Sequence, residues 1–137
     1  MGVALGSVIE AAAAHYGTEG SLASPSNATA TVKAPDGTIY SSETLDDDRV
    51  VVDIGVAAGN TQAVNDVNAR RLGITVAQNQ AGTGLVRCRF IGTAPGSWAG
   101  ELVLTGAAGR RDVVPFEITV TPSPVTGATY SGPTDVG

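Results

Sequence analysis

The stretch Ala28-Thr29-Ala30-Thr31-Val32-Lys33-Ala34-Pro35-Asp36-Gly37-Thr38-Ile39-Tyr40-Ser41-Ser42 decides the fold class. Its first half alternates small or apolar residues with polar ones, which is the pattern of a strand with one buried face. Pro35-Asp36-Gly37 then supplies turn chemistry, because proline presets φ, aspartate bonds the turn backbone and glycine accepts positive φ. Residues 38–42 resume the extended pattern, so the stretch predicts a β-hairpin.

The same alternation predicts five further strands. Their buried faces are Val50, Val52, Ile54 and Val56; Leu72, Ile74 and Val76; Val86, Cys88 and Phe90; Trp98, Leu102 and Leu104; and Val114, Phe116, Ile118 and Val120. A polar loop over residues 57–66 and the Pro95-Gly96 turn separate some of them. About seven short strands at this spacing predict an all-β fold, an immunoglobulin-like antiparallel β-sandwich.

The N-terminal residues show a different period and predict a short helix over residues 7–17. Ser7 and Glu10 match the S-x-x-E capping box, and Gly17 stands where a C-cap glycine is expected. An apolar stripe at helical spacing comprises Val8, Ile9, Ala12, Ala13 and Tyr16. We therefore expect three parts: an N-terminal helical arm over 1–20, a sandwich over 21–121 and a tail over 122–137 that is rich in Pro, Gly, Ser and Thr.

The composition argues against several function classes. The chain of 137 residues has a formal net charge of −5 and spreads its few basic residues, whereas nucleic-acid binders present a basic patch. No apolar run is long enough to span a membrane, and the N-terminus lacks the basic region of a signal peptide. The single cysteine, Cys88, excludes an intrachain disulfide. We expect neither nucleic-acid nor membrane partners.

Candidate chemical sites are weak. His15 is the single histidine and is far in sequence from Cys88, whose strand pattern indicates a buried, inert thiol. Asp46, Asp47, Asp48 and Asp53 could supply oxygen ligands, but the spacing of a calcium loop is absent and a solvated loop is the simpler interpretation. We predict no catalytic residue, no metal site and no cofactor. Trp98 is expected in the core, with an interface anchor as the alternative.

Two segments resemble parts of a known group of domains. Residues 30–40, ATVKAPDGTIY, resemble the first hairpin of immunoglobulin-like domains in phage baseplate upper proteins and fibre adaptors. Residues 95–105, PGSWAGELVLT, followed by residues 114–120, VPFEITV, resemble their closing strand pair. The resemblance covers about residues 28–121. It implies a non-enzymatic bacteriophage structural protein that resides in the virion.

The expected role is therefore contact with other virion subunits. The chain would decorate or cement the capsid, touching major capsid proteins, or dock a fibre or tail subunit, and it would form a homo-oligomer. The alternative is a bacterial or phage adhesin or a carbohydrate-binding module, which requires exposed aromatic side chains. The helical arm and the tail offer the expected partner-binding residues, namely Val8, Ile9, Tyr16, Val125 and Tyr130.

Overall fold

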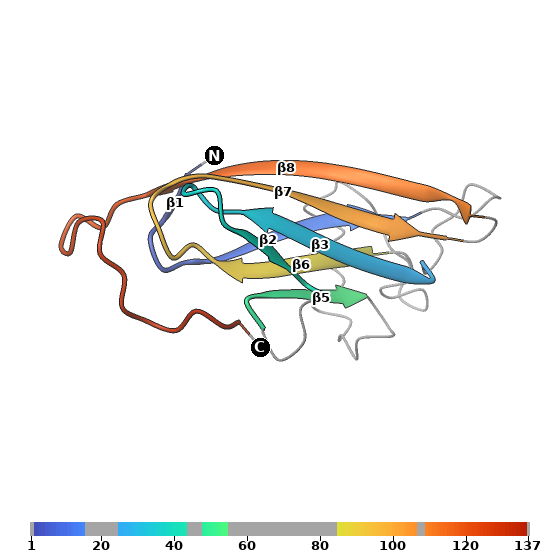
Figure 1. The fold of residues 1–137 in the computed structure, drawn as a ribbon, viewed down its shortest axis with the longest axis horizontal. Coiled ribbons are helices and arrows are strands. Elements are labelled where there is room, and N and C mark those ends of the chain that lie inside the picture. Colours follow the sequence, from blue (N-terminus) through green and yellow to red (C-terminus); the bar gives the residue numbers. More distant parts are fainter. Residues whose placement is uncertain (1, 16–24, 44–47, 55–84, 107–108, 137) are drawn as a thin grey trace, which may run out of the picture.

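The structure is a computed structural model that describes residues 2–15, 25–43, 48–54, 85–106 and 109–136. These residues form eight β-strands and no helix. The strands are β1 (Gly2–Ala4), β2 (Val8–Ala14), β3 (Asn27–Lys33), β4 (Ile39–Ser41), β5 (Val50–Ile54), β6 (Leu85–Ile91), β7 (Gly96–Thr105) and β8 (Arg111–Thr121). A five-stranded sheet has the order β1-β8-β7-β3-β4, and a three-stranded sheet has the order β2-β6-β5. The sheets form two layers (Figure 1), as expected of a β-sandwich.

The hairpin predicted from residues 28–42 is confirmed. β3 and β4 pair in antiparallel fashion, with Val32 opposite Tyr40. Gly37 has a φ of 91°, and the Thr38 amide donates a 2.9 Å hydrogen bond to Asp36 Oδ1. That hydrogen bond lowers the pKa of Asp36. Four of the five other predicted strands correspond to β5, β6, β7 and β8, whereas the fifth, expected at 72–76, and the loop at 57–66 lie outside the described residues.

The core lies between the two sheets and follows the period of two. Its buried members come from both layers: Ile9 and Ala13 of β2, Ala30 and Val32 of β3, Val50 of β5, Val86, Cys88 and Phe90 of β6, Trp98, Leu102 and Leu104 of β7, and Val120 of β8, together with Ala34. Trp98 is 2% exposed, and its indole N–H donates a 2.9 Å hydrogen bond to the Ala94 carbonyl. The core position predicted for Trp98 is confirmed, with its polar atom satisfied.

The helix predicted over residues 7–17 is wrong, because residues 8–14 form strand β2. β2 pairs in antiparallel fashion with β6 along its whole length, with Ile9 opposite Phe90 and Ala13 opposite Val86. Ile9, Ala13 and His15 are all buried, which is a period of two. Burial against the facing sheet outweighs the modest helix preference of the alanine run. Residues 2–4 and 8–14 therefore belong to the two sheets.

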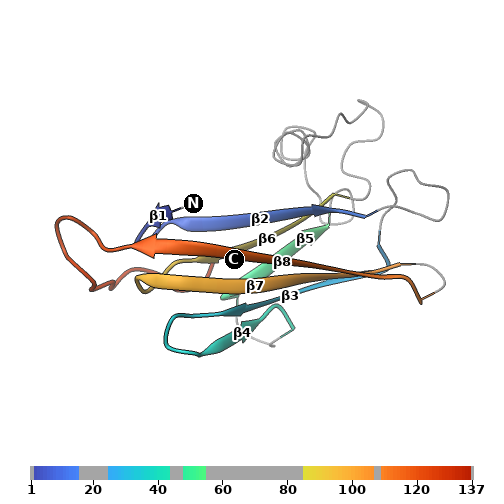
Figure 2. The same cartoon turned by 90° about the horizontal axis from the view of Figure 1, so that it is seen from above.

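The expectation that all strands are antiparallel is also wrong, because of strand β1. β1 pairs in parallel with β8, the last strand, with Val3 opposite Val120. The chain then crosses to the other sheet within three residues, and the Gly6 amide donates a 2.9 Å hydrogen bond to the Gly92 carbonyl. Seen from above, β1 and β2 lie on the same side of the molecule (Figure 2).

The tail after β8 folds back on its own domain. Two hydrogen bonds between the Ser123 and Gly127 backbones close a tight loop. The Tyr130 ring packs against Gly6, and the Val136 amide donates a 2.9 Å hydrogen bond to the Asp48 carbonyl. In Figure 1 the tail runs around one end of the sandwich, from β8 to the side of β5.

Candidate functional site

The outer face of the five-stranded sheet exposes apolar side chains around a depression. Because successive side chains alternate, the strands that bury Val32, Trp98 and Val120 present their other residues to solvent. Two large apolar side chains stand on this outer face, Ile39 of β4 at 63% exposure and Val113 of β8 at 44%. Exposed aliphatic side chains on a sheet face are a feature of contact surfaces when they gather around a depression.

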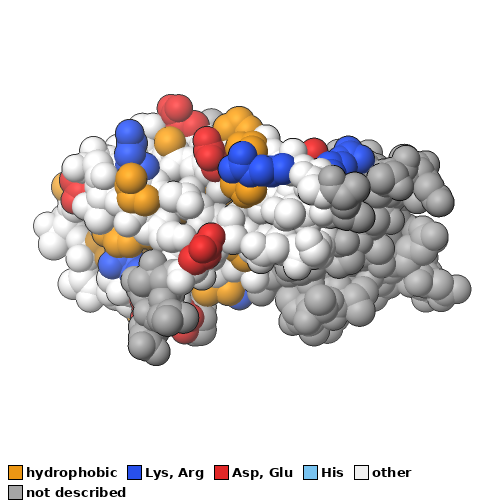
Figure 3. Space-filling view, turned by 45° about the vertical axis from the view of Figure 1, so that its right-hand side comes forward, with side chains coloured by type: hydrophobic (Ala, Val, Ile, Leu, Met, Phe, Trp, Pro, Cys, Tyr) orange, Lys and Arg blue, Asp and Glu red, His pale blue; other side chains and the backbone are white. Residues whose placement is uncertain are grey.

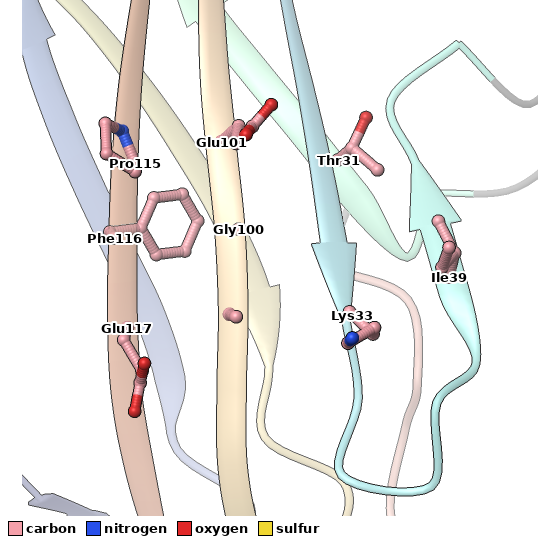
Figure 4. Close-up of a pocket in the computed structure, with 9 residues that line it drawn as sticks. Thr31, Lys33, Ile39, Gly100, Glu101, Pro115, Phe116 and Glu117 are labelled. Carbon is pink, nitrogen blue, oxygen red and sulfur yellow. The ribbon is translucent and has the colours of Figure 1, made fainter.

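Such a depression lies across β8, β7, β3 and β4, and we call it the sheet hollow. Its volume is about 550 Å³. It is lined by Thr31, Lys33, Ile39, Ala99, Gly100, Glu101, Pro115, Phe116 and Glu117 (Figure 4). The register explains this grouping, since Lys33 is opposite Ala99 and Ala99 is opposite Glu117. The consecutive strands β7 and β8 and the distant strand β3 thus place a cation, a methyl group and a carboxylate in one row.

The small side chain of Ala99 leaves the hollow open on the outer face, and Gly100 beside it faces inward. Ala99 carries only a methyl group outward, and the next residue, Gly100, carries no side chain. Gly100 is opposite Phe116 in the register, and the Phe116 ring occupies the space where a Gly100 Cβ would stand. The ring also packs against Phe90 of the other sheet, with 6.1 Å between ring centroids. The outer face of the sheet is therefore depressed at the middle of β7, with longer side chains on the strands on either side.

Charged groups of both signs border the hollow. Glu117 accepts a 3.1 Å hydrogen bond from the Ser97 hydroxyl. Within the described part of the chain, Lys33 and Glu101 take part in no ion pair, so their charges are available to a partner. In the space-filling view, acidic and basic side chains alternate with small hydrophobic areas, and no broad field of one sign is visible among the described residues (Figure 3).

A second polar constellation joins the two sheets at the opposite end of the sandwich. His15, which follows β2, is 2% exposed, and its Nδ1 lies 3.1 Å from Asp112 Oδ2 of β8. Arg110 Nε lies 3.7 Å from the same carboxylate oxygen. The imidazole fills the space where a Gly106 Cβ would stand, so its Nε2 edge packs on backbone. This geometry suits a buried link between the layers, because the ring is 2% exposed and packs on the Gly106 backbone.

Cys88 is buried, as its strand pattern predicted. The side chain is fully buried between Val86 and Phe90 on the inner face of β6. Burial raises the pKa of the Cys88 thiol to about 12, well above its ordinary value of 9.0. The thiolate, which is the nucleophilic form, is therefore suppressed at neutral pH.

The five predicted partner-binding residues differ in their exposure in the structure. Val8 and Val125 are exposed, at 53% and 88%. Ile9 is buried in the core at 2% exposure, and Tyr130 packs on Gly6 while its hydroxyl donates a 2.6 Å hydrogen bond to the Pro133 carbonyl. Tyr16 lies outside the described residues. The structure therefore brings none of these side chains together into one site.

The aspartate cluster is mostly beyond the described part of the chain. Asp46 and Asp47 lie outside it, as does the side chain of Asp53, whereas Asp48 is exposed. Among the residues that are described, no group of three or more His, Cys, Asp or Glu side chains is arranged to hold a metal ion. In the same residues, no helix has the length and apolar character needed to cross a membrane.

Comparison of the chain with protein-family models, with curated proteins and with solved structures finds no match. The functional argument therefore depends on the geometry of the sheet hollow and on the strand order.

Proposed function

We propose that the fold is immunoglobulin-like. In such sandwiches one sheet contains strands B, E and D and the other contains G, F and C, with C′ added beside C in the variable type. The order β2-β6-β5 matches B-E-D, and the order β8-β7-β3-β4 matches G-F-C-C′. The parallel strand β1 adds to the G-equivalent edge. This correspondence uses all eight described strands in their chain order.

We further propose that the protein is a non-enzymatic structural component of a bacteriophage particle. The observation that carries the proposal is the sheet hollow, an exposed depression with apolar side chains and unpaired charges at its border. Ile39 and Pro115 offer apolar area, and Lys33, Glu101 and Glu117 offer ionic contacts around it. An apolar centre with a polar rim is the anatomy of a protein–protein interface. The resemblance of residues 30–40, 95–105 and 114–120 to phage domains supports the particle as the setting.

The particle role has two forms, decoration or cementing of the capsid and docking of a fibre or tail subunit. Both use the outer face of the five-stranded sheet as the contact, with the exposed Val125 loop as a secondary one. Contact with a partner would bury the apolar side chains that line the hollow, and each buried methylene contributes about 0.8 kcal/mol to the free energy of binding. The charges then select the partner more than they add affinity.

An adhesin or carbohydrate-binding module remains the second candidate, because the sheet hollow has the volume of a small-ligand site and Phe116 lines it. The arrangement of the aromatic rings disfavours it. Phe90 and Trp98 are buried at 1% and 2% exposure, and Phe116 packs against Phe90. Tyr40 lies under the guanidinium of Arg49, with 4.1 Å from Cζ to the ring centroid. Titration of the chain with mono- and oligosaccharides in a calorimeter would detect this second function.

Purification of particles from the source culture tests the particle role. Particles are banded in a density gradient, and the chain is quantified in the band by mass spectrometry. We expect the chain at a fixed stoichiometry to a major particle protein, retained after a high-salt wash. Recovery of the chain in the host-cell fraction alone would contradict the proposal.

A further inference from the structure

The outer edge of β2 is the longest strand edge left open among the described residues. β2 has seven residues and is the terminal strand of the three-stranded sheet. The edges of the five-stranded sheet, β1 and β4, have three residues each, and the other edge of the smaller sheet, β5, has five. Short edge strands are one way in which proteins prevent unwanted pairing, and β2 does not use it.

The backbone geometry shows which groups of β2 face the open side. Gly92 N–H donates a 3.1 Å hydrogen bond to the Ser7 carbonyl, so Ser7 faces β6. Because antiparallel pairing alternates, Val8, Glu10, Ala12 and Ala14 point their N–H and C=O groups away from β6. These groups form a regular template for another strand.

The side chains of β2 also lack the usual protection of an edge. The strand reads VIEAAAA, with no lysine and no proline. Its single charge, Glu10, lies 3.7 Å from Arg87 of the neighbouring strand β6. Alanine methyl groups leave room for a second backbone to approach to the spacing of a sheet, about 4.8 Å.

We propose that two copies of the chain pair through β2 in antiparallel fashion and join their three-stranded sheets into one six-stranded sheet. With Ala11 at the two-fold axis, Val8 of one copy is opposite Ala14 of the other, and both present outward-facing backbone groups to the pair. Glu10 of each copy is directly opposite Ala12 of the other, so the two Glu10 carboxylates are diagonal neighbours and do not face each other directly. Val8, which is 53% exposed, gains a neighbour across the interface.

A second copy fits this edge better than an unrelated strand, because a symmetric antiparallel pair satisfies both edges at once. An isologous contact of this kind closes after two subunits and does not grow into a fibre. The inference does not depend on the particle role, since a dimer of this geometry serves an adhesin equally well. The dimer also leaves the sheet hollow of each copy accessible on the other sheet.

Sedimentation equilibrium of the full chain with matched variants tests the pairing. Ala12→Glu places a carboxylate opposite Glu10 of the other copy at two symmetric positions, while Arg87 is its neighbour within the same copy. Ala12→Pro removes an outward N–H, a change that an edge strand tolerates. Ala12→Lys at the same position introduces the opposite charge, which faces Glu10 of the other copy.

We expect the unaltered chain to be a dimer. Ala12→Glu should weaken dimerisation by about tenfold or more, Ala12→Pro should abolish it, and Ala12→Lys should retain it. Circular dichroism should show the same strand content for all folded variants. If the proline variant does not fold, the Ala12→Glu variant alone tests the pairing. Amide exchange should show protection of Val8 and Ala14 in the dimer that is lost in the Ala12→Glu monomer. A monomeric chain at about 100 µM, or a dimer insensitive to Ala12→Glu, would overturn the proposal.

Discussion

The buried thiol of Cys88 predicts a specific loss of stability at alkaline pH. The side chain is fully buried, and burial raises the pKa of the thiol from 9.0 to about 12. Above pH 9 the unfolded chain releases the thiol proton while the folded chain keeps it, so the unfolded state binds fewer protons. Stability must then fall as pH rises, by about 1.4 kcal/mol per pH unit between the two pKa values. Below pH 9 the thiol contributes no pH dependence.

Urea unfolding at pH 8, 9 and 10 measures this effect, with Cys88→Ala as the matched control. At pH 8 the alanine variant is less stable by about 1–2 kcal/mol because it leaves a small cavity. The difference between the two proteins should shrink by about 1.4 kcal/mol from pH 8 to pH 10, since the control lacks the ionising thiol. Parallel pH profiles would refute the burial argument, and so would labelling of the native thiol by a thiol reagent at the rate seen in urea.

Two further substitutions test the packing described above. Gly100→Ala should destabilise the fold by about 1–3 kcal/mol in urea titration, because the new methyl group overlaps the Phe116 ring. The control Gly2→Ala should change stability by less than about 0.5 kcal/mol, because its new methyl group would lie at ordinary contact distances of 3.6 Å and 3.7 Å from its neighbours. Equal effects of the two substitutions would contradict this packing. Asp112→Ala should lower the free energy of unfolding by about 1–3 kcal/mol, because it leaves the buried His15 ring without its partner. The loss should be smaller when His15→Ala is already present. Full additivity in that double-mutant cycle would show that the pair does not interact.

The local pattern of the sequence was sufficient for most strands. The hairpin over residues 28–42 is specified by its own local sequence. The alternation of residues determines which side chains face inward, and Pro35-Asp36-Gly37 determines the turn. The inward faces of β6 and β7 followed from the same alternation, and so did the burial of Cys88 and Trp98. These features depend on residues within about ten positions of one another.

β2 shows where local information misleads. Ser7 and Glu10 match a helix-capping motif, and the alanine run that follows favours a helix in isolation. Alanine fits either a helix or a strand, because it is small enough for the inner or the outer face of both. Pairing with β6, more than seventy residues away, decides between them. A preference of a few tenths of a kcal/mol per residue cannot oppose a full ladder of hydrogen bonds and a buried face.

The sheet hollow and the link between the layers could not be predicted for a related reason. The hollow requires Lys33, Ala99 and Glu117 in one row, and that row is set by strand register between distant segments. The link joins His15 and Asp112, which are 97 residues apart. One signal was available, since Ala99-Gly100 interrupts β7 with two small residues beside polar neighbours. It indicates a depression but not its border.

The most direct test of the central claim, that the sheet hollow docks a particle subunit, is a sedimentation assay with particles assembled without the chain. The purified chain is mixed with these particles as the unaltered protein, as Ala99→Arg and as Thr119→Arg. Ala99→Arg fills the hollow, whereas Thr119→Arg adds the same charge to the same sheet face at a position that does not line it. We predict that the unaltered chain and Thr119→Arg sediment with the particles and that Ala99→Arg stays in the supernatant. Sedimentation of Ala99→Arg to the same extent as the unaltered chain would contradict the account.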